Sequence, residues 1–358
     1  MFAKKMKNMF YRVLPAVMIS LAVLAGCGTK ETETEATVSE EIQSVETVES
    51  ETAETTESEA EVVEEKSAVP DKDRCGNEIK VPEKVEKIVS MAPSTTQILI
   101  DLGYADQIIA CDTYSAASYG SALKADIPQF DMMTPDNEQI AALEADIVFT
   151  TGMSYSKGEN VYAAVKEIGV CVADIPSSSS LEEIKEDIRF IGACIGANDK
   201  AEEIVGKMEE SIKEIQEITA KIPEEEKKTV LFELSTPTAD YPEIYSCGYT
   251  TYIHEILTIT GLKSVTGNEE SAWISISEEA AIAANPDVIL SADTYTPDVV
   301  NVILGTKGWE NVNAVKNQEV YKIDGDTISR PNHHVIDVMY EIINLVYPEY
   351  LEEADEAA

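Results

Sequence analysis

Short apolar runs alternate with amphipathic helical patterns along most of the chain, and this alternation is interrupted once. Apolar runs of this length are typical of strands that are buried on both faces of a parallel sheet and joined by helices. Two of the helical patterns end at Gly103 and Gly169, and glycine is the usual residue just after a helix. The expected strands lie at 87–92, 107–112, 146–151, 170–175, 228–234, 286–293 and 318–324.

The interruption is the stretch 181–222, which has a helical pattern throughout, with one break at 196–199. It predicts an α/β fold with two Rossmann-like α/β lobes joined by a single long linking helix. A linking helix bends little, so we expect the lobes to open and close only slightly. Ligands of open α/β sheets bind beyond the carboxyl ends of the strands, so a cleft is expected there. We assign 71–178 to the N-terminal lobe, 179–225 to the linking helix and 226–358 to the C-terminal lobe.

The N-terminus carries a secretion signal at 1–26. Lys4, Lys5 and Arg12 give it a basic start, and its apolar run at 13–26 is too short to span a bilayer with its own flanks. The run ends in "LAGC", the cleavage pattern of lipoproteins. A plain secretion signal followed by a chance cysteine is the alternative. We expect Cys27 to be lipidated, because two or three acyl chains on one cysteine anchor a protein firmly.

Residues 27–70 comprise this cysteine and an acidic tether. The segment has no aromatic residue and is dense in Glu, Thr and Ser, so it is expected to be disordered. The formal net charge of the chain is −40, and beyond the signal the only arginines are Arg74, Arg189 and Arg330. No basic stripe exists, which argues against nucleic acid as a partner.

Enzyme motifs are absent from the sequence. There is no GxSxG, no HExxH, no phosphate-binding glycine loop and no CxxC, so we expect no catalysis. Cys111, Cys171 and Cys194 lie in apolar segments and are interpreted as small core residues. The sequence does not decide whether Cys75 and Cys247 form a disulfide.

Several segments together resemble a known family. The lipoprotein signal, the helical link, "KIVSMAPSTTQILIDLGYADQIIACDTYS", "NEQIAALEADIVFTT" and "GWENVNAVKNQEVYKID" resemble the iron-complex and vitamin B12 substrate-binding proteins of ABC importers. The resemblance implies the class III periplasmic binding protein fold and a monomer that is lipid-anchored outside the cytoplasm. It implies an ABC permease and ATPase as partners, and no covalently bound cofactor. The transported ligand would be a small-molecule metal chelate, either a corrinoid or a ferric siderophore.

The vitamin B12 binders of this family hold the corrinoid between aromatic side chains. Their first-lobe tyrosine follows the second strand, where "CDTYS" supplies Tyr114. An ungapped match places Tyr245 and Trp273 at their second-lobe aromatics, each of which lies just before a helix. Rigid aromatic side chains suit a large, flat and mostly apolar ring system. Two first-lobe positions that are tryptophan in those proteins are Met132 and Thr151 here, which puts cobalamin itself in doubt and leaves room for a cobinamide-like ligand or an iron chelate.

Arg330 and His333 follow a strand and a turn and are further candidates for contact with the ligand. Siderophore binders of the family use arginines against anionic chelates, and arginine is scarce here, so a neutral or cationic complex fits better. Haem is an alternative within the class, with Tyr114, Met132, Met153 or a histidine as axial ligand. A divalent-metal site of His254, His333 and a carboxylate can also be drawn.

His333 and His334 are adjacent at an expected helix start. Adjacent helical residues point about 100° apart, so we do not expect both to ligate one metal ion.

One glutamate in each lobe lies near an expected helix start. If Thr134 caps the first of these helices, Glu138 is its fourth residue. If Ser275 caps the second, Glu278 completes a capping box and Glu279 is again the fourth residue. The glutamates could simply complement the helix dipoles. In the family, one glutamate per lobe meets arginines of the permease, which makes Glu138 and Glu279 the expected docking residues.

Overall fold

The computed structural model describes residues 69–156, 159–238 and 241–351, which belong to one compact unit. The expected secretion signal, Cys27 and nearly all of the tether lie outside these residues. Within the described part, no helix is long and apolar enough to cross a membrane.

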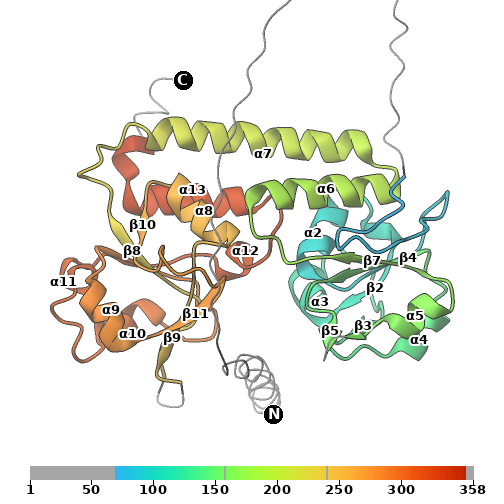
Figure 1. Ribbon diagram of the computed structural model, residues 1–358, viewed down its shortest axis with the longest axis horizontal. Helices are drawn as coiled ribbons and strands as arrows, with labels where there is room; N and C mark the ends of the chain where they lie inside the picture. Colours follow the sequence, from blue (N-terminus) through green and yellow to red (C-terminus); the bar gives the residue numbers. More distant parts are fainter. Residues whose placement is uncertain (1–68, 157–158, 239–240, 352–358) are drawn as a thin grey trace, which may run out of the picture. The chain divides into compact units, whose positions relative to one another are not determined.

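The first lobe is built on a parallel five-stranded sheet in the order β3-β2-β1-β4-β7 (Figure 1). Each expected strand of this lobe is present, and helices connect the parallel neighbours as the alternation predicted. The strands are β1 (Ile88–Ser90), β2 (Ile108–Asp112), β3 (Gln129–Phe130), β4 (Ile147–Thr151) and β7 (Cys171–Ile175). The helices are α2 (Pro93–Asp101), α3 (Thr113–Tyr119), α4 (Asn137–Ala142) and α5 (Ala163–Glu167), with a 3-10 turn at Ala105–Gln107 and a small hairpin of β5 (Tyr155–Ser156) and β6 (Glu159–Asn160).

The second lobe is built on a parallel four-stranded sheet in the order β10-β8-β12-β13. Its strands are β8 (Thr229–Glu233), β10 (Lys263–Ser264), β12 (Val288–Ser291) and β13 (Val320–Lys322). Its helices are α8 (Tyr252–Ile259), α9 (Glu278–Ala284), α10 (Val299–Leu304), α11 (Asn313–Asn317), α12 (Gly325–Ile328) and α13 (Val335–Val346). The two lobes therefore have the predicted α/β class.

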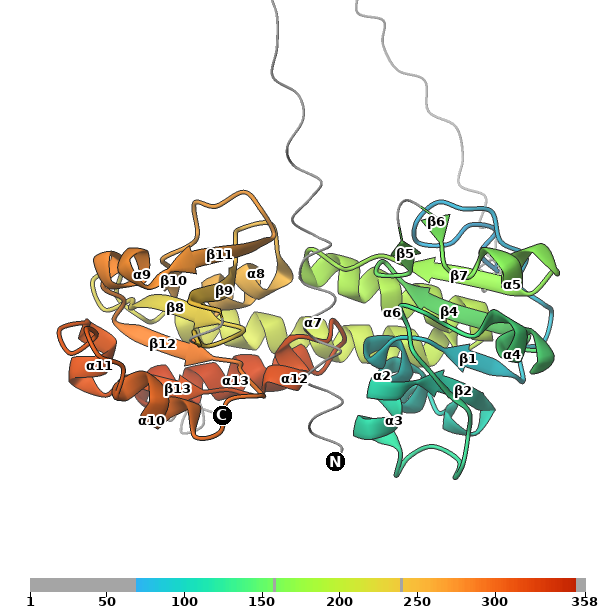
Figure 2. The same cartoon turned by 90° about the horizontal axis from the view of Figure 1, so that it is seen from below.

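The helical stretch between the lobes forms two helices, α6 (Leu181–Ile195) and α7 (Asn198–Thr219), which lie side by side (Figures 1 and 2). The chain reverses at Gly196, whose φ of 75° is a left-handed conformation that glycine adopts without strain. The predicted break at 196–199 is thus confirmed. Helix α6 packs on α2 of the first lobe, and α7 also contacts α8 and α13 of the second lobe. At 22 residues, α7 is about 33 Å long and is the element that links the lobes.

Alternate side chains of the strands enter different cores. In β12, Val288 and Leu290 pack beneath the long helices, whereas Ile289 between them faces α9, α10 and α11. Ile88 and Val89 divide in the same way in the first lobe. This period of two is the normal geometry of a strand, and it buries each sheet on both faces. The core beneath α6 and α7 includes residues from both lobes, so the linking helices are part of the shared core.

A two-stranded antiparallel ribbon, β9 (Glu243–Cys247) with β11 (Trp273–Ser277), was not predicted from the sequence. The sequence interpretation placed Tyr245 and Trp273 just before helices. In the structure both lie within strands, and α9 begins directly after β11. Gly248 follows β9 where a Cβ atom would lie 2.2 Å from the carbonyl oxygen of Ser271, so only glycine allows this close approach.

The cysteines are all unpaired within the described residues, so a bridge between Cys75 and Cys247 is not present. Cys111, Cys171 and Cys194 are buried, as the apolar segments around them predicted.

Candidate functional site

An aspartate turn presents Tyr114 at the carboxyl end of β2. Asp112 is the last residue of the strand and is completely buried. Its Oδ1 accepts hydrogen bonds from the backbone N–H groups of Tyr114 and Ser115, both at 2.9 Å. The carboxylate therefore caps α3 and fixes the backbone of Tyr114, whose side chain is 44% exposed.

The second lobe repeats this turn after β12. Asp293 is buried, and its Oδ1 accepts hydrogen bonds from the N–H groups of Tyr295 at 2.7 Å and Thr296 at 3.0 Å. Tyr295 is 64% exposed. The sequence holds the signal for this residue, because "DTYS" at 112–115 and "DTYT" at 293–296 each begin at the end of an expected strand. The sequence interpretation used the first tyrosine and missed the second.

The two aspartates differ in their ionisation. Burial raises the pKa of Asp112, despite the hydrogen bonds that it accepts from Ser115 and Tyr114. Burial opposes ionisation of Asp293 as well, but there the accepted hydrogen bonds outweigh it and the pKa is lowered. Two physical differences act together: Asp293 is the less deeply buried of the two, and its Oδ2 also accepts a hydrogen bond from the backbone N–H of Thr236 at 3.0 Å.

Tyr114 and Tyr295 lie close enough to affect each other's ionisation. Burial is the main cause that raises the pKa of Tyr295, and the negative charge of an ionised Tyr114 is the next. One tyrosine comes from each lobe, and both follow strands of parallel sheets. The carboxyl ends of the two sheets therefore bring exposed aromatic side chains together, as the strand-end rule predicts.

Tyr245 and Trp273 form a stacked pair on the ribbon. Their ring centroids are 6.2 Å apart with an interplanar angle of 22°, and their exposed fractions are 41% and 43%. Tyr245 pairs in register with Ser275, so the tryptophan two residues earlier is its diagonal neighbour on the same face. The other tryptophan, Trp309, is buried and donates from Nε1 to Glu278 Oε2 at 3.1 Å.

Met132 and His254 lie apart from this aromatic surface. Met132 is buried in the core of the first lobe, packed with residues such as Phe130 and Ile140. His254 lies on α8, its ring against Gly267, and burial lowers its pKa. It does not belong to a cluster of metal-binding side chains within the described residues.

Arg330 joins the two lobes. Its Nη2 lies 3.0 Å from Asp326 Oδ1, while its Nη1 donates to the hydroxyl of Tyr119 at 3.1 Å. Its guanidinium carbon is 5.5 Å from the centroid of that ring, a cation–π geometry. Tyr119 belongs to α3 of the first lobe, so Arg330 contacts the first lobe through this ring.

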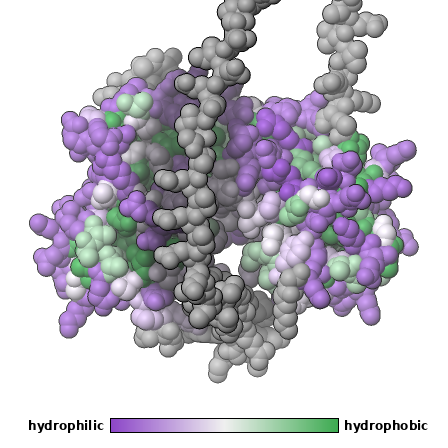
Figure 3. All heavy atoms as spheres, viewed as in Figure 1, coloured by the Kyte–Doolittle hydropathy of each residue, from purple (hydrophilic) through white to green (hydrophobic). Residues whose placement is uncertain are grey.

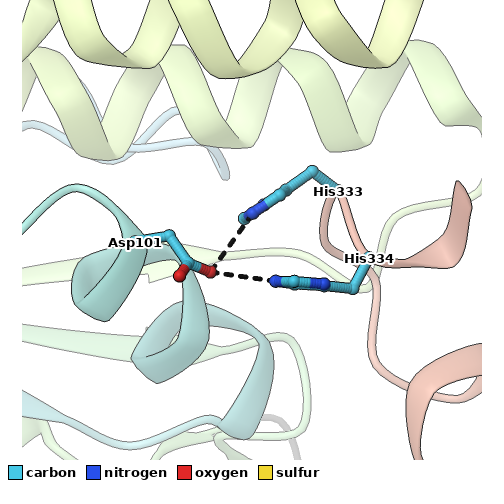
Figure 4. Close-up of side chains that lie close together, drawn as sticks. All are labelled: Asp101, His333 and His334. Carbon is cyan, nitrogen blue, oxygen red and sulfur yellow. Dashed lines mark hydrogen bonds and ion pairs between the residues drawn. The ribbon is translucent and has the colours of Figure 1, made fainter. Parts of the chain in front are cut away.

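His333 and His334 both face Asp101 at the end of α2 (Figure 4). Their Nε2 atoms lie 3.2 and 3.0 Å from the same carboxylate oxygen, Oδ2. The expectation that adjacent histidines diverge is wrong, because α13 begins only at Val335 and both residues occupy the preceding turn. Hydrogen bonds to Asp101, and then to Asp337, raise the pKa of His334 to about 9.

Glu138 occupies the second position of α4. The cap of this helix is Asp136, whose Oδ1 accepts from the N–H of Gln139 at 3.0 Å. The predicted cap at Thr134 is therefore wrong, and Glu138 is exposed two residues closer to the helix start than expected.

Glu279 occupies the second position of α9. Ser277 caps this helix by accepting from the N–H of Ala280 at 3.2 Å, whereas Ser275 lies within β11. The predicted capping box is wrong, and Glu278 instead accepts from Trp309. The equivalence of the two docking candidates persists, since Glu138 and Glu279 are both exposed second residues.

Hydrophilic side chains cover much of the face shown in Figure 3, on both lobes. Each arginine in the described part of the chain is ion-paired. Arg74 contacts Glu186 and Asp187, and Arg189 contacts Glu202. The arrangement can stack an apolar or cationic ring system, and it offers little charge to bind a strongly anionic one.

Known proteins are similar to this chain in sequence and in fold. The model of the family described as "Periplasmic binding protein" matches residues 88–327. An uncharacterised ABC transporter substrate-binding lipoprotein of Bacillus subtilis is 28% identical over 281 residues, which are 78% of this chain and 86% of that protein. A vitamin B12-binding protein of Vibrio parahaemolyticus is 23% identical over 261 residues, covering 73% and 89% of the two chains. The solved apo structure of the periplasmic haem-binding protein RhuT from Roseiflexus sp. RS-1 has a TM-score of 0.64 at 20% identity, covering 74% of this chain and 99% of that one.

Proposed function

Because the chain belongs to the periplasmic binding protein family, we propose that it delivers a metal chelate to an ABC importer. Its family is the one that the sequence resembles, the substrate-binding proteins for iron complexes and vitamin B12. The proposed ligand is a corrinoid or a ferric siderophore, held between the two lobes without chemical change.

The paired aspartate turns carry this proposal. Buried carboxylates at the carboxyl ends of β2 and β12 hold Tyr114 and Tyr295 by the same hydrogen bonds. The Tyr245–Trp273 stack adds a second aromatic surface in the C-terminal lobe. Exposed aromatic rings are costly for a soluble surface, and rigid rings that lose little entropy suit a large apolar ligand.

The charge pattern narrows the ligand class. With Arg74, Arg189 and Arg330 all engaged by carboxylates, no arginine of the described chain is left over for a multiply anionic catecholate. A corrinoid or a hydroxamate complex has little net negative charge and fits this surface better. Arg330 and His333 remain proposed ligand contacts. Arg330 contacts Tyr119 and His333 contacts Asp101, both in the first lobe, so the two side chains lie where the lobes meet. Met132 would contact the ligand only after a rearrangement of the first-lobe core in which it is buried.

Haem is the alternative ligand, and the fold similarity to a haem-binding protein favours including it in any test. Tyr114 is an exposed phenol at the carboxyl end of a strand and would be its axial ligand.

The proposal also covers how the protein is anchored to the membrane and how it docks on the permease. Cys27 would carry the lipid anchor, as expected from the lipoprotein pattern in the sequence. Glu138 and Glu279 would meet arginines of the permease. Both side chains are exposed at equivalent helix positions, one per lobe, which suits a partner that grips both lobes at once.

Calorimetric titration of the purified protein with cobalamin, cobinamide, a ferric hydroxamate siderophore and haem tests the ligand. We expect one of these to bind with a dissociation constant below the micromolar range and to quench Trp273, the exposed tryptophan. Replacing Trp273 by Phe should weaken the binding of that ligand, whereas replacing the buried Trp309 by Phe should leave its binding unchanged. Binding of none of the four would refute the proposed function.

A further inference from the structure

Asp101, His333 and His334 form a cluster of which the proposed function uses only His333, and only as a contact of the transported ligand. Asp101 ends α2 in the first lobe, and the two histidines lie in the turn before α13 in the second lobe (Figure 4). Each residue offers one ligand atom, and these atoms all lie within 4.8 Å of one another. The side chains are partly buried, so the cluster is sheltered but reachable from solvent.

We propose that Asp101, His333 and His334 bind a divalent transition-metal ion that clips the two lobes together. The two Nε2 atoms lie 3.2 and 3.0 Å from Asp101 Oδ2. Ligands about 2.0–2.1 Å from a tetrahedral ion are about 3.3 Å from each other, so a small inward rotation of the rings would complete three of four positions. A fourth position stays open for water.

The partners of His334 fit the role of a ligand. Its Nδ1 lies 2.9 Å from Asp337 Oδ2, and this carboxylate would keep the proton on Nδ1 while a metal ion replaces the proton that Nε2 shares with Asp101. Gln97 Nε2 donates to Asp101 Oδ2 at 2.7 Å and lies 3.5 Å from His334 Nε2, so it closes another side of the cluster. The ring of His333 stands against that of His334, with centroids 4.4 Å apart.

The donor set selects the kind of ion. Two imidazole nitrogens and one carboxylate are typical ligands of Zn²⁺ and of the late first-row metals, whereas Mg²⁺ and Ca²⁺ prefer oxygen ligands alone. Because the ligands come from both lobes, metal binding would favour the arrangement in which the lobes meet. This site does not depend on the identity of the transported chelate.

The test uses the full chain with Cys27→Ser and Cys75→Ser, so that neither thiol competes for metal. After chelator treatment, we expect calorimetric titration with Zn²⁺ to show one equivalent bound. Asp101→Asn and His334→Ala should each lower the affinity at least tenfold, and Asp337→Asn, which removes a positioning residue, should lower it by about tenfold. His254→Ala, which removes the one histidine outside the cluster, is the matched control and should bind Zn²⁺ as the parent does.

Cobalt provides a second measurement that does not depend on the variants folding well. Co²⁺ in the parent protein should give visible ligand-field bands of a low-coordinate nitrogen and oxygen site, and these bands should be bleached by Zn²⁺. Absence of stoichiometric Zn²⁺ binding would overturn the proposal. So would Zn²⁺ binding that Asp101→Asn and His334→Ala leave unchanged, or that His254→Ala abolishes.

Discussion

Asp112 and Asp293 perform the same structural task in the two lobes. Each is buried at the end of a strand, and each accepts hydrogen bonds on Oδ1 from the N–H groups two and three residues later. The residue two positions on is a tyrosine in both cases. The repeated turn gives Tyr295 the same local backbone setting as Tyr114, although the family resemblance indicated only Tyr114.

Replacing Tyr295 by Ala is therefore expected to weaken ligand binding about as much as replacing Tyr114 by Ala. Truncation of an aromatic contact residue should raise the dissociation constant about tenfold, equivalent to about 1.4 kcal/mol, in calorimetric titrations with the ligand identified above. Tyr340→Ala is the control, because the hydroxyl of Tyr340 is bonded to Glu214 on α7. If Tyr114→Ala weakens binding and Tyr295→Ala does not, Tyr295 lies outside the ligand site.

The sequence predicted the lobes because their central strands are continuous apolar runs with helices between them. It did not predict the β9–β11 ribbon, whose strands are polar on one face and pair across 25 intervening residues. Its stability depends on that long-range pairing, and a cluster of tyrosines around Gly248 is equally typical of a turn. Helix α3 was missed for a related reason, since its residues 113–119 are mostly small and polar.

The prediction of part of the candidate site depended on where helices begin, and helix boundaries are the feature that is hardest to predict from sequence. A helix start at Val335, one residue after His334, decides whether two histidines diverge or converge on Asp101. A shift of two residues decides whether Ser275 or Ser277 caps α9. Neighbouring serines both satisfy the local pattern, and tertiary pairing of β11 selects between them.

The Ser277→Ala variant should lower the free energy of unfolding by about 1 kcal/mol, because the N–H of Ala280 loses its partner at the start of α9. Ser275→Ala should change it by less than about 0.5 kcal/mol, since Ser275 is an exposed strand residue. Urea denaturation of the two variants beside the parent measures both values. The reverse order of effects would favour the capping box that the sequence suggested.

Charge reversal at both docking candidates, Glu138→Lys with Glu279→Lys, is expected to abolish uptake of the ligand by cells. Both side chains are exposed and neither belongs to the aromatic surface, so the dissociation constant of the purified protein should be unchanged. Glu210→Lys, an exposed residue of α7, is the matched control and should leave uptake intact. Normal uptake by the double variant would refute the docking assignment.

Glu233 gives the protein a pH-dependent stability. It is the last residue of β8, is 1% exposed, and has a pKa raised to about 8 by burial, against an ordinary value of 4.5. The negative charges of Asp293 and Glu278 also raise the pKa of Glu233, whereas the hydrogen bond that Thr236 donates to Glu233 lowers it. Between these two pKa values the folded protein retains a proton that the unfolded chain has lost. The contribution of Glu233 is therefore fully present below pH 4.5 and is lost as the pH rises through 8.

The free energy of unfolding should accordingly fall with rising pH in this window, by at most about 1.4 kcal/mol per pH unit from this residue. Glu233→Gln removes the ionisation and keeps nearly the same shape, so the difference in stability between variant and parent should grow steadily from pH 5.5 to pH 8. Urea denaturation at several pH values measures this difference, in which the contributions of all other groups cancel. A constant difference across that range would mean that the pKa of Glu233 is the same in the folded and unfolded states.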